Sequence, residues 1–142
     1  MKRFLLDTNI VSELTRVKPE QNVVHWFSSV DESGLYLSVL TIGEIRKGLT
    51  ALPKARKRLD LEKWFNDLKY RFAGRIISVD ETVAEQWGIL SSAARKQGKP
   101  LSVIDGLLAA TAVNHNLTLV TRNVNDFAID KLSILNPWNS SP

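Results

Sequence analysis

Near its start the chain reads Phe4-Leu5-Leu6-Asp7-Thr8-Asn9, an apolar run that stops at three polar residues. An apolar run followed by helix-capping side chains predicts a buried strand that turns directly into a helix. The same change recurs at Leu35 to Leu40 before Glu44, and at Leu117 to Val120 before Asp126. Strand-like segments that alternate with helical ones predict an α/β fold with a mainly parallel sheet.

Periodicity and capping residues place the other elements. Apolar residues at helical spacing predict a long helix between Pro53 and Gly74, and Asp80 and Gly98 mark the start and end of another. The expected strands are 3–6, 35–40, 75–79, 118–121 and, at the sheet edge, 132–135; the expected helices are 10–15, 21–29, 41–49, 54–72, 81–97 and 102–115.

The composition limits the class of protein. With 142 residues the chain has the length of one domain, and the absence of cysteine excludes disulfides, thiolate ligands and a cysteine nucleophile. Lys2 and Arg3 resemble the start of a signal peptide, but Asp7 interrupts the apolar stretch too early. No run approaches the roughly 18 apolar residues of a membrane span, so we expect a soluble cytoplasmic protein.

The net charge of +4 is mild, but its distribution is uneven. Residues 51–75 hold eight basic residues against three acids. A basic surface beside an acidic pocket suits a polyanion that is drawn in electrostatically. The basic cluster from Lys54 to Arg58 has two open interpretations, a solvated helix face or a contact to substrate or partner.

Four acids, Asp7, Glu44, Asp105 and Asp126, are expected near strand ends or first helical turns. Each has a structural interpretation when taken alone: Asp7 as a helix cap, Asp126 in an Asx turn, and the other two in capping boxes. Those boxes would be Thr41 with Glu44 and Ser102 with Asp105. Their shared position at one edge of the sheet favours a site instead, because ligand-binding groups gather there in open α/β sheets. Asp80 is expected only to cap a helix.

Carboxylates gathered at one place repel one another unless a cation lies among them. Without cysteine, and with His25 and His115 far apart in sequence, zinc does not suit the pattern. Oxygen ligands suit Mg²⁺ or Mn²⁺. The chain has no glycine-rich phosphate loop, no nucleophile elbow and no Ser/His/Asp arrangement. A divalent metal acting on a phosphodiester is therefore the favoured chemistry.

Taken together, the motifs resemble those of the PIN-domain ribonucleases, and more closely those of the VapC-type toxins of bacterial toxin–antitoxin pairs. The resemblance spans essentially the whole chain. It rests on Leu5 to Asn9, Ser38 to Gly48, Ile104 to Ala112, Val120 to Phe127 and the ending Asn136-Pro137-Trp138. It implies a single PIN domain over residues 1–142, with a three-layer α/β/α arrangement around a mainly parallel sheet of four to five strands.

The resemblance also implies a function: a metal-dependent endoribonuclease in which a metal-activated water cleaves RNA, tRNA among the candidates. Asp7 and Asp105 would hold Mg²⁺ or Mn²⁺ directly, and Glu44 and Asp126 would complete the catalytic site. Thr121 matches a small hydroxyl residue beside them. At Asn123 many relatives carry Asp, so either Asn123 or Asp126 completes the site.

The resemblance implies an antitoxin partner, a homodimer, and contact with operator DNA only through the antitoxin. The apolar faces around Trp26 and Trp64 are candidate contact surfaces for the antitoxin or for a second copy. Two alternatives stay open: a catalytically silent PIN-fold binding module, and a Mg²⁺-binding phosphotransfer receiver domain. The receiver domain is disfavoured because the first strand ends in one acid rather than two.

Overall fold

The apolar run at the start of the chain forms the middle strand of the sheet. In the computed structural model, which describes residues 2–127 and 129–139, this strand has a parallel neighbour on each side. Phe4 is paired with Leu35 on one side and with Thr118 on the other. Met1, Ala128 and residues 140–142 of the predicted domain lie outside the described residues.

Five parallel strands form the sheet, in the order β3-β2-β1-β4-β5. The predicted sheet of four to five mainly parallel strands is confirmed. The strands are β1 (Phe4–Leu6), β2 (Leu35–Ser38), β3 (Ile76–Ile77), β4 (Thr118–Val120) and β5 (Ile134–Leu135).

Six helices and two short 3₁₀ turns connect the strands. The helix predicted at 21–29 has the same bounds in the structure, and the others shift by a few residues at their ends. They are α1 (Thr8–Glu13), α2 (Gln21–Ser29), α3 (Val39–Ala51), α4 (Arg56–Arg71), α5 (Glu81–Lys96) and α6 (Val103–Asn114), with η1 (Glu32–Gly34) and η2 (Val124–Phe127).

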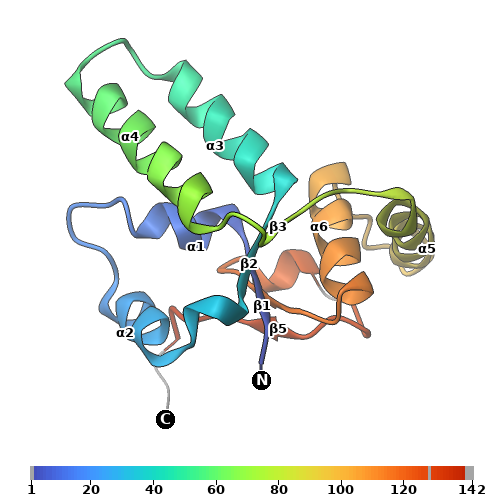
Figure 1. The fold of residues 1–142 in the computed structure, drawn as a ribbon. Coiled ribbons are helices and arrows are strands. Elements are labelled where there is room, and N and C mark those ends of the chain that lie inside the picture. Colours follow the sequence, from blue (N-terminus) through green and yellow to red (C-terminus); the bar gives the residue numbers. More distant parts are fainter. Residues whose placement is uncertain (1, 128, 140–142) are drawn as a thin grey trace.

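The helices cover both faces of the sheet, which gives the predicted three layers. Successive side chains of β1 point to opposite faces. Phe4 and Leu6 join one core cluster with residues of α1 to α4, and Leu5 joins a second cluster with residues of α5 and α6. Figure 1 shows the two groups of helices on either side of the strands.

The start of α3 differs from the prediction. The strand expected at 35–40 ends at Ser38, whose hydroxyl accepts a hydrogen bond from the Leu40 backbone N–H at 3.0 Å. Serine is itself a strong N-cap. Helix α3 is therefore capped by Ser38, three residues earlier than by Thr41. The predicted Thr41–Glu44 capping box is therefore wrong. Thr41 is buried in the first turn, and Glu44 lies in the second turn.

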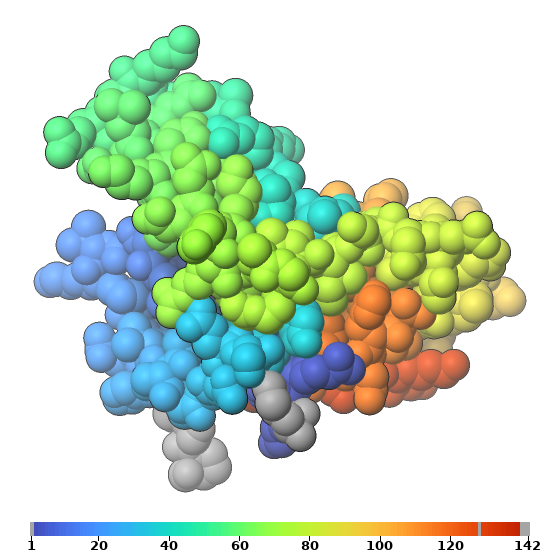
Figure 2. Space-filling model, viewed as in Figure 1, coloured from blue at the N-terminus to red at the C-terminus, as the bar shows by residue number. Residues whose placement is uncertain are grey.

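The hairpin of α3 and α4 stands out from the body of the molecule (Figures 1 and 2). Much of its charge is paired internally: Arg56 lies 3.3 Å from Asp60, and Glu62 lies 2.8 Å from Arg46 and 3.5 Å from Arg58. Part of the basic cluster is thus a salt-bridged helix surface. Lys54 and Lys57 are exposed and form no ion pair within the described part of the chain.

Among the helices of the described residues, none combines the length and the apolar character needed to cross a membrane.

Candidate acidic site at the carboxyl edge of the sheet

The order of the strands fixes where a site is expected. From β1 the chain moves outward to β2 and β3, then returns across the sheet to place β4 on the other side of β1. Ligands of open α/β sheets bind at such a reversal, beyond the carboxyl ends of the two strands that flank it. Those ends are Asp7, directly after β1, and Thr121, directly after β4.

Asp7 is held in a fixed orientation at this point. Its Oδ1 accepts from the Thr8 backbone N–H at 2.7 Å, as expected of a helix cap. Its Oδ2 accepts from the Thr121 hydroxyl at 2.8 Å and, at 3.4 Å, from the Asn9 amide. The residue is only 8% exposed. Asp7 thus does more than cap α1, because its second oxygen accepts a hydrogen bond from Thr121 at the end of β4.

Burial raises the pKa of the Asp7 carboxyl above its ordinary value. Hydrogen bonds from Thr121 and Thr8 oppose this rise, and the negative charges of Glu44 and Asp105 add to it. Ionisation of Asp7 is therefore energetically disfavoured in the protein when no cation is bound.

Glu44 reaches the site from α3. Its Oε1 accepts from the Thr8 hydroxyl at 2.6 Å, and that hydroxyl also lies 3.4 Å from the Thr41 hydroxyl. Thr8 therefore orients two acids, Asp7 through its backbone N–H and Glu44 through its hydroxyl. The sequence contained a sign of this, because three capping residues in a row, Asp7 to Asn9, exceed what one helix start requires. The pairing of Thr8 with Glu44 was nevertheless missed.

Asp105 lies in the first turn of α6, as predicted. The Ser102 hydroxyl caps this helix by accepting from the Asp105 backbone N–H at 3.2 Å. Burial raises the pKa of the Asp105 carboxyl; a hydrogen bond from Ser102 opposes the rise, and the charges of Asp126 and Glu44 add to it. Asp105 and Asp126 line one pocket of about 320 Å³. Asp126 itself is carried by η2, in the turn that follows β4.

The structure thus brings all four predicted acids to one region, where their charges act on one another. None of them forms an ion pair with a basic side chain within residues 2–127 and 129–139. The same residues contain no ready cage of three His, Asp or Glu side chains around one point. The donor set is uncompensated carboxylate oxygen, which fits a hard divalent cation that keeps part of its water shell.

Backbone contacts settle where the turn after β4 lies. The Asn123 N–H donates to the Thr121 hydroxyl at 3.1 Å, and the Arg122 N–H donates to the Asn9 side chain at 3.3 Å. Asn9 also donates to Thr121 at 3.2 Å. Thr121 therefore lies beside Asp7, as the family resemblance predicted. Asn9 joins the ends of β1 and β4 and was not singled out from the sequence.

Asp80 has the structural role predicted for it. Its carboxylate accepts from the Val83 backbone N–H at 3.0 Å and caps α5. This acid at a strand end takes no part in the site.

Comparison with known proteins agrees with this geometry. The family model described as "PIN domain" matches residues 4–131. Toxin FitB of Neisseria gonorrhoeae is 38% identical over 137 residues, which cover 96% of this chain and 99% of that protein. The VapC ribonuclease Y4jK of Sinorhizobium fredii is 34% identical over 136 residues, or 95% of this chain and 97% of the relative.

A solved structure gives the same result in three dimensions. The structure of FitAB bound to an IR36 DNA fragment contains a chain that matches with a TM-score of 0.93 at 36% identity, covering 98% of both chains. Matches of this extent leave no room for the receiver-domain alternative. The chain belongs to the PIN-domain family, and within it to the VapC-type toxins.

Proposed function

We propose that this chain, as a single PIN domain over residues 1–142, is a Mg²⁺- or Mn²⁺-dependent endoribonuclease and the toxin of a toxin–antitoxin pair. The observation that carries the proposal is the group of four acids at the strand reversal, with which no basic side chain of the described residues forms an ion pair. The relatives supply the substrate class, since Y4jK is named a ribonuclease and FitB a toxin.

Asp7 and Asp105 would hold the metal directly, while Glu44 and Asp126 complete the site through water or a second ion. Mg²⁺ commonly takes one or two carboxylates, keeps several waters and accepts phosphate oxygens, so a three-residue cage is not required. Asp126 suits the fourth position better than Asn123, because its charge acts on Asp105 and both line one pocket. A bound ion would supply positive charge to the scissile phosphate and lower the pKa of the attacking water.

The other residues of the site keep these oxygens in place. Thr121 and the Thr8 N–H fix the two oxygens of Asp7, and the Thr8 hydroxyl fixes Glu44. Carboxylates that are oriented before the ligand arrives need little rearrangement when it binds, which is the main way a protein contributes to phosphoryl transfer. Catalysis would therefore depend on these neutral side chains as well as on the acids.

Removing the metal is the direct test. Purified protein is expected to cleave RNA in Mg²⁺ or Mn²⁺, to lose cleavage in EDTA, and to recover it when the metal is restored. Added Mg²⁺ should also raise the melting temperature, by the equivalent of about 2.7 kcal/mol at one hundred times its Kd. Undiminished cleavage in excess EDTA would refute metal dependence. A protein that binds Mg²⁺ but cleaves no RNA would favour the silent binding module.

An apolar groove away from the acids is the surface we assign to the antitoxin. It has a volume of about 440 Å³ and is lined mainly by residues in or next to α1, α2 and α4, among them Leu14, Phe27, Trp64 and Leu68, with Glu32 and Arg71 as its charged residues. Leu14 is 41% exposed, so the groove is open to a partner. Trp64 was predicted to mark this surface. Trp26, the other candidate, packs edge-to-face on Phe4, with 5.2 Å between the ring centroids, and lines other pockets.

Replacing Leu14 by glutamate places a charge in this groove without touching the acids. We expect Leu14→Glu to weaken binding of the co-expressed antitoxin by tenfold or more, because the charge loses its water on complex formation. RNA cleavage by the free protein should be unchanged. Ile89→Glu is the matched control, since Ile89 is 59% exposed on α5 and lies outside the groove. Equal affinity of the two variants for the antitoxin would place the partner elsewhere.

Two further features come from the family resemblance. Operator DNA is expected to be bound through the antitoxin, in line with the DNA-bound FitAB structure. A homodimer is also expected, and light scattering of the free protein tests it, because a monomer-sized species would contradict it. Mapping of RNA 5′ ends after induction would identify the RNA that is cut.

A further inference from the structure

A pocket beside the acidic site has features that the proposed chemistry does not use. It measures about 320 Å³, within the range of roughly 300–1,000 Å³ typical of small-ligand sites. Asp105 and Asp126 line one part of it, and Lys99, Pro100 and Leu101 of the loop between α5 and α6 line another. A basic side chain thus lies in the same pocket as two of the four acids.

The loop that carries Lys99 is fixed at both ends. At the end of α5 the Gly98 N–H donates to the Arg95 carbonyl and the Lys99 N–H to the Ala94 carbonyl, each at 3.0 Å. Gly98 has φ of +75°, a conformation that favours glycine. These are the two hydrogen bonds of a Schellman motif. At the other end the Ser102 hydroxyl caps α6. The backbone of Lys99 is therefore held in place independently of its side chain.

The ammonium group of Lys99 has no carboxylate partner. Within residues 2–127 and 129–139 no ion pair includes it, and the residue is exposed. Lys54 and Lys57, at the tip of the α3–α4 hairpin, differ in position. Helix α3, with 13 residues, is about 20 Å long, so the hairpin tip lies about that far from the sheet edge where α3 begins. Among the described residues, Lys99 is the basic residue that lines the pocket of Asp105 and Asp126.

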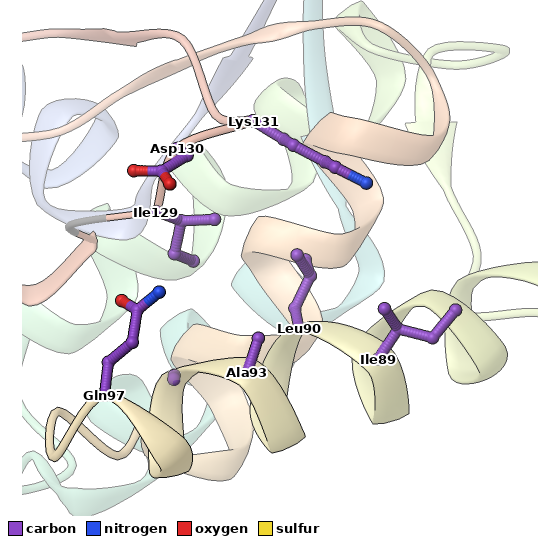
Figure 3. Close-up of a pocket in the computed structure, with 8 residues that line it drawn as sticks. Ile89, Leu90, Ala93, Gln97, Ile129, Asp130 and Lys131 are labelled. Carbon is purple, nitrogen blue, oxygen red and sulfur yellow. The ribbon is translucent and has the colours of Figure 1, made fainter.

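A second hollow adjoins this pocket. Figure 3 shows it between α5 and the segment 129–131, with Leu90 and Ala93 of α5 on the side of Ile129. Its volume is about 150 Å³, and none of the four acids lines it. It shares Ala94 and Ile129 with the larger pocket. Gln97, Asp130 and Lys131 also line this hollow, but most of its lining is aliphatic, so the Lys99 pocket is the part beside the acids that suits a charged strand.

We propose that the pocket formed by Asp105, Asp126, Ser102 and Lys99 receives the RNA nucleotide next to the scissile phosphate, with the Lys99 ammonium binding the neighbouring backbone phosphate. The proposal rests on the proposed ribonuclease function and adds to it the direction in which the strand leaves the acids. Lys99 is a substrate-positioning residue, because it holds a phosphate that does not react. As a cation just after α5 it also complements the helix dipole, and the test must separate that role from RNA binding.

Binding is measured in an Asp7→Asn background, which is disabled for cleavage, with a short fluorescently labelled single-stranded RNA at several salt concentrations. One phosphate contact contributes about 0.7 to the slope of log affinity against log salt for a single strand. Lys99→Glu should lower that slope by about 0.7, which is about fivefold in affinity at 0.1 M salt. Lys99→Arg should retain both values. In the active protein, Lys99→Glu should raise KM and leave kcat nearly unchanged.

Lys57→Glu is the matched control, because Lys57 is exposed and unpaired in the described structure but lies at the hairpin tip. It makes the same change in charge and should leave the salt slope unaltered. Equal losses of RNA affinity in the two variants would refute the proposed role of the pocket and leave the proposed function intact. So would an unchanged affinity in Lys99→Glu while the parent protein cleaves RNA. A Lys99-specific loss of binding in a protein that never cleaves RNA would support the pocket and end the ribonuclease proposal.

Discussion

Asp7→Asn is expected to lose RNA cleavage by about a thousandfold or more and, at the same time, to melt at a higher temperature than the parent protein without metal. The loss follows because an amide adds no negative charge where Asp7 and Asp105 would hold a cation. The gain follows because burial of the Asp7 carboxylate, together with a smaller repulsion from the charges of Glu44 and Asp105, disfavours its ionised form and raises its pKa. The amide removes that repulsion and keeps an oxygen for the Thr8 N–H.

The effect on stability should depend on pH in one direction. A carboxyl whose pKa is higher in the folded than in the unfolded protein stabilises the fold least when it is ionised. That cost is absent below the unfolded-state pKa, grows as pH rises through the folded-state pKa, and is complete at neutral pH. The difference in melting temperature between Asp7→Asn and the parent should therefore be largest at neutral pH and shrink in acid. A difference that grows in acid would contradict the shift.

Asp105→Ala and Asp80→Ala provide a comparison between two acids that both lie at helix starts. Asp105→Ala should abolish cleavage while the protein remains folded. Asp80→Ala should cost about 1 kcal/mol of stability, because the cap of α5 is lost, and should leave cleavage intact. Purified Asp105→Ala that cleaves RNA in Mg²⁺ as well as the parent would remove this residue from the site.

Gly106→Ala is expected to destabilise the fold by about 1–3 kcal/mol and to lower cleavage by about a hundredfold. A Cβ at Gly106 would lie 2.8 Å from the Trp87 indole nitrogen and 2.9 Å from its Cδ1, so either the Trp87 ring must shift or α5 and α6 must separate, and we expect the helices to separate. Gly106 follows Asp105 in α6, and the displacement would therefore move that carboxylate. A shift of about 1 Å in a group at the reacting centre is enough for a loss of that size.

Gly88→Ala is the control for this substitution. Gly88 lies in α5, one residue after Trp87, and a Cβ there would meet nothing within 4 Å. Alanine should stabilise that helix by about 0.5–1 kcal/mol and leave cleavage unchanged. Unfolding by denaturant and initial rates of RNA cleavage measure both effects. Parallel behaviour of the two variants would show that Trp87 yields easily and that the close helix contact does not position Asp105.

Sequence patterns predicted the strands and helix starts that depend only on residues close in sequence. The apolar run before Asp7 gave β1, and Ser102 with Asp105 gave the start of α6, because strand burial and helix capping are decided within a few positions. The start of α3 was misplaced because Ser38 and Thr41 are both good caps, and only the short pairing of β2 with β3 shows where the strand ends. Local rules do not rank two acceptable caps.

Contacts between residues that are far apart in sequence could not be predicted from those local patterns. The Thr8 hydroxyl reaches Glu44 across 36 positions, and Gly106 lies against Trp87 of a different helix. The Lys99 pocket likewise depends on how the loop before α6 lies against η2. Each is set by the packing of complete elements on the sheet, so the residues that orient the acids were harder to predict than the acids themselves.

The long separation in sequence between Asp7 and Thr121 affects when the acidic site can form during synthesis of the protein. The hydrogen bond between them spans 114 positions, and β1 has an open edge until β4 pairs with it. Parallel strands joined across such a distance pair late, since the long loop must close first. A nascent chain still within the ribosome thus carries Asp7 without its partner, and toxicity should arise only after nearly the whole polypeptide has emerged.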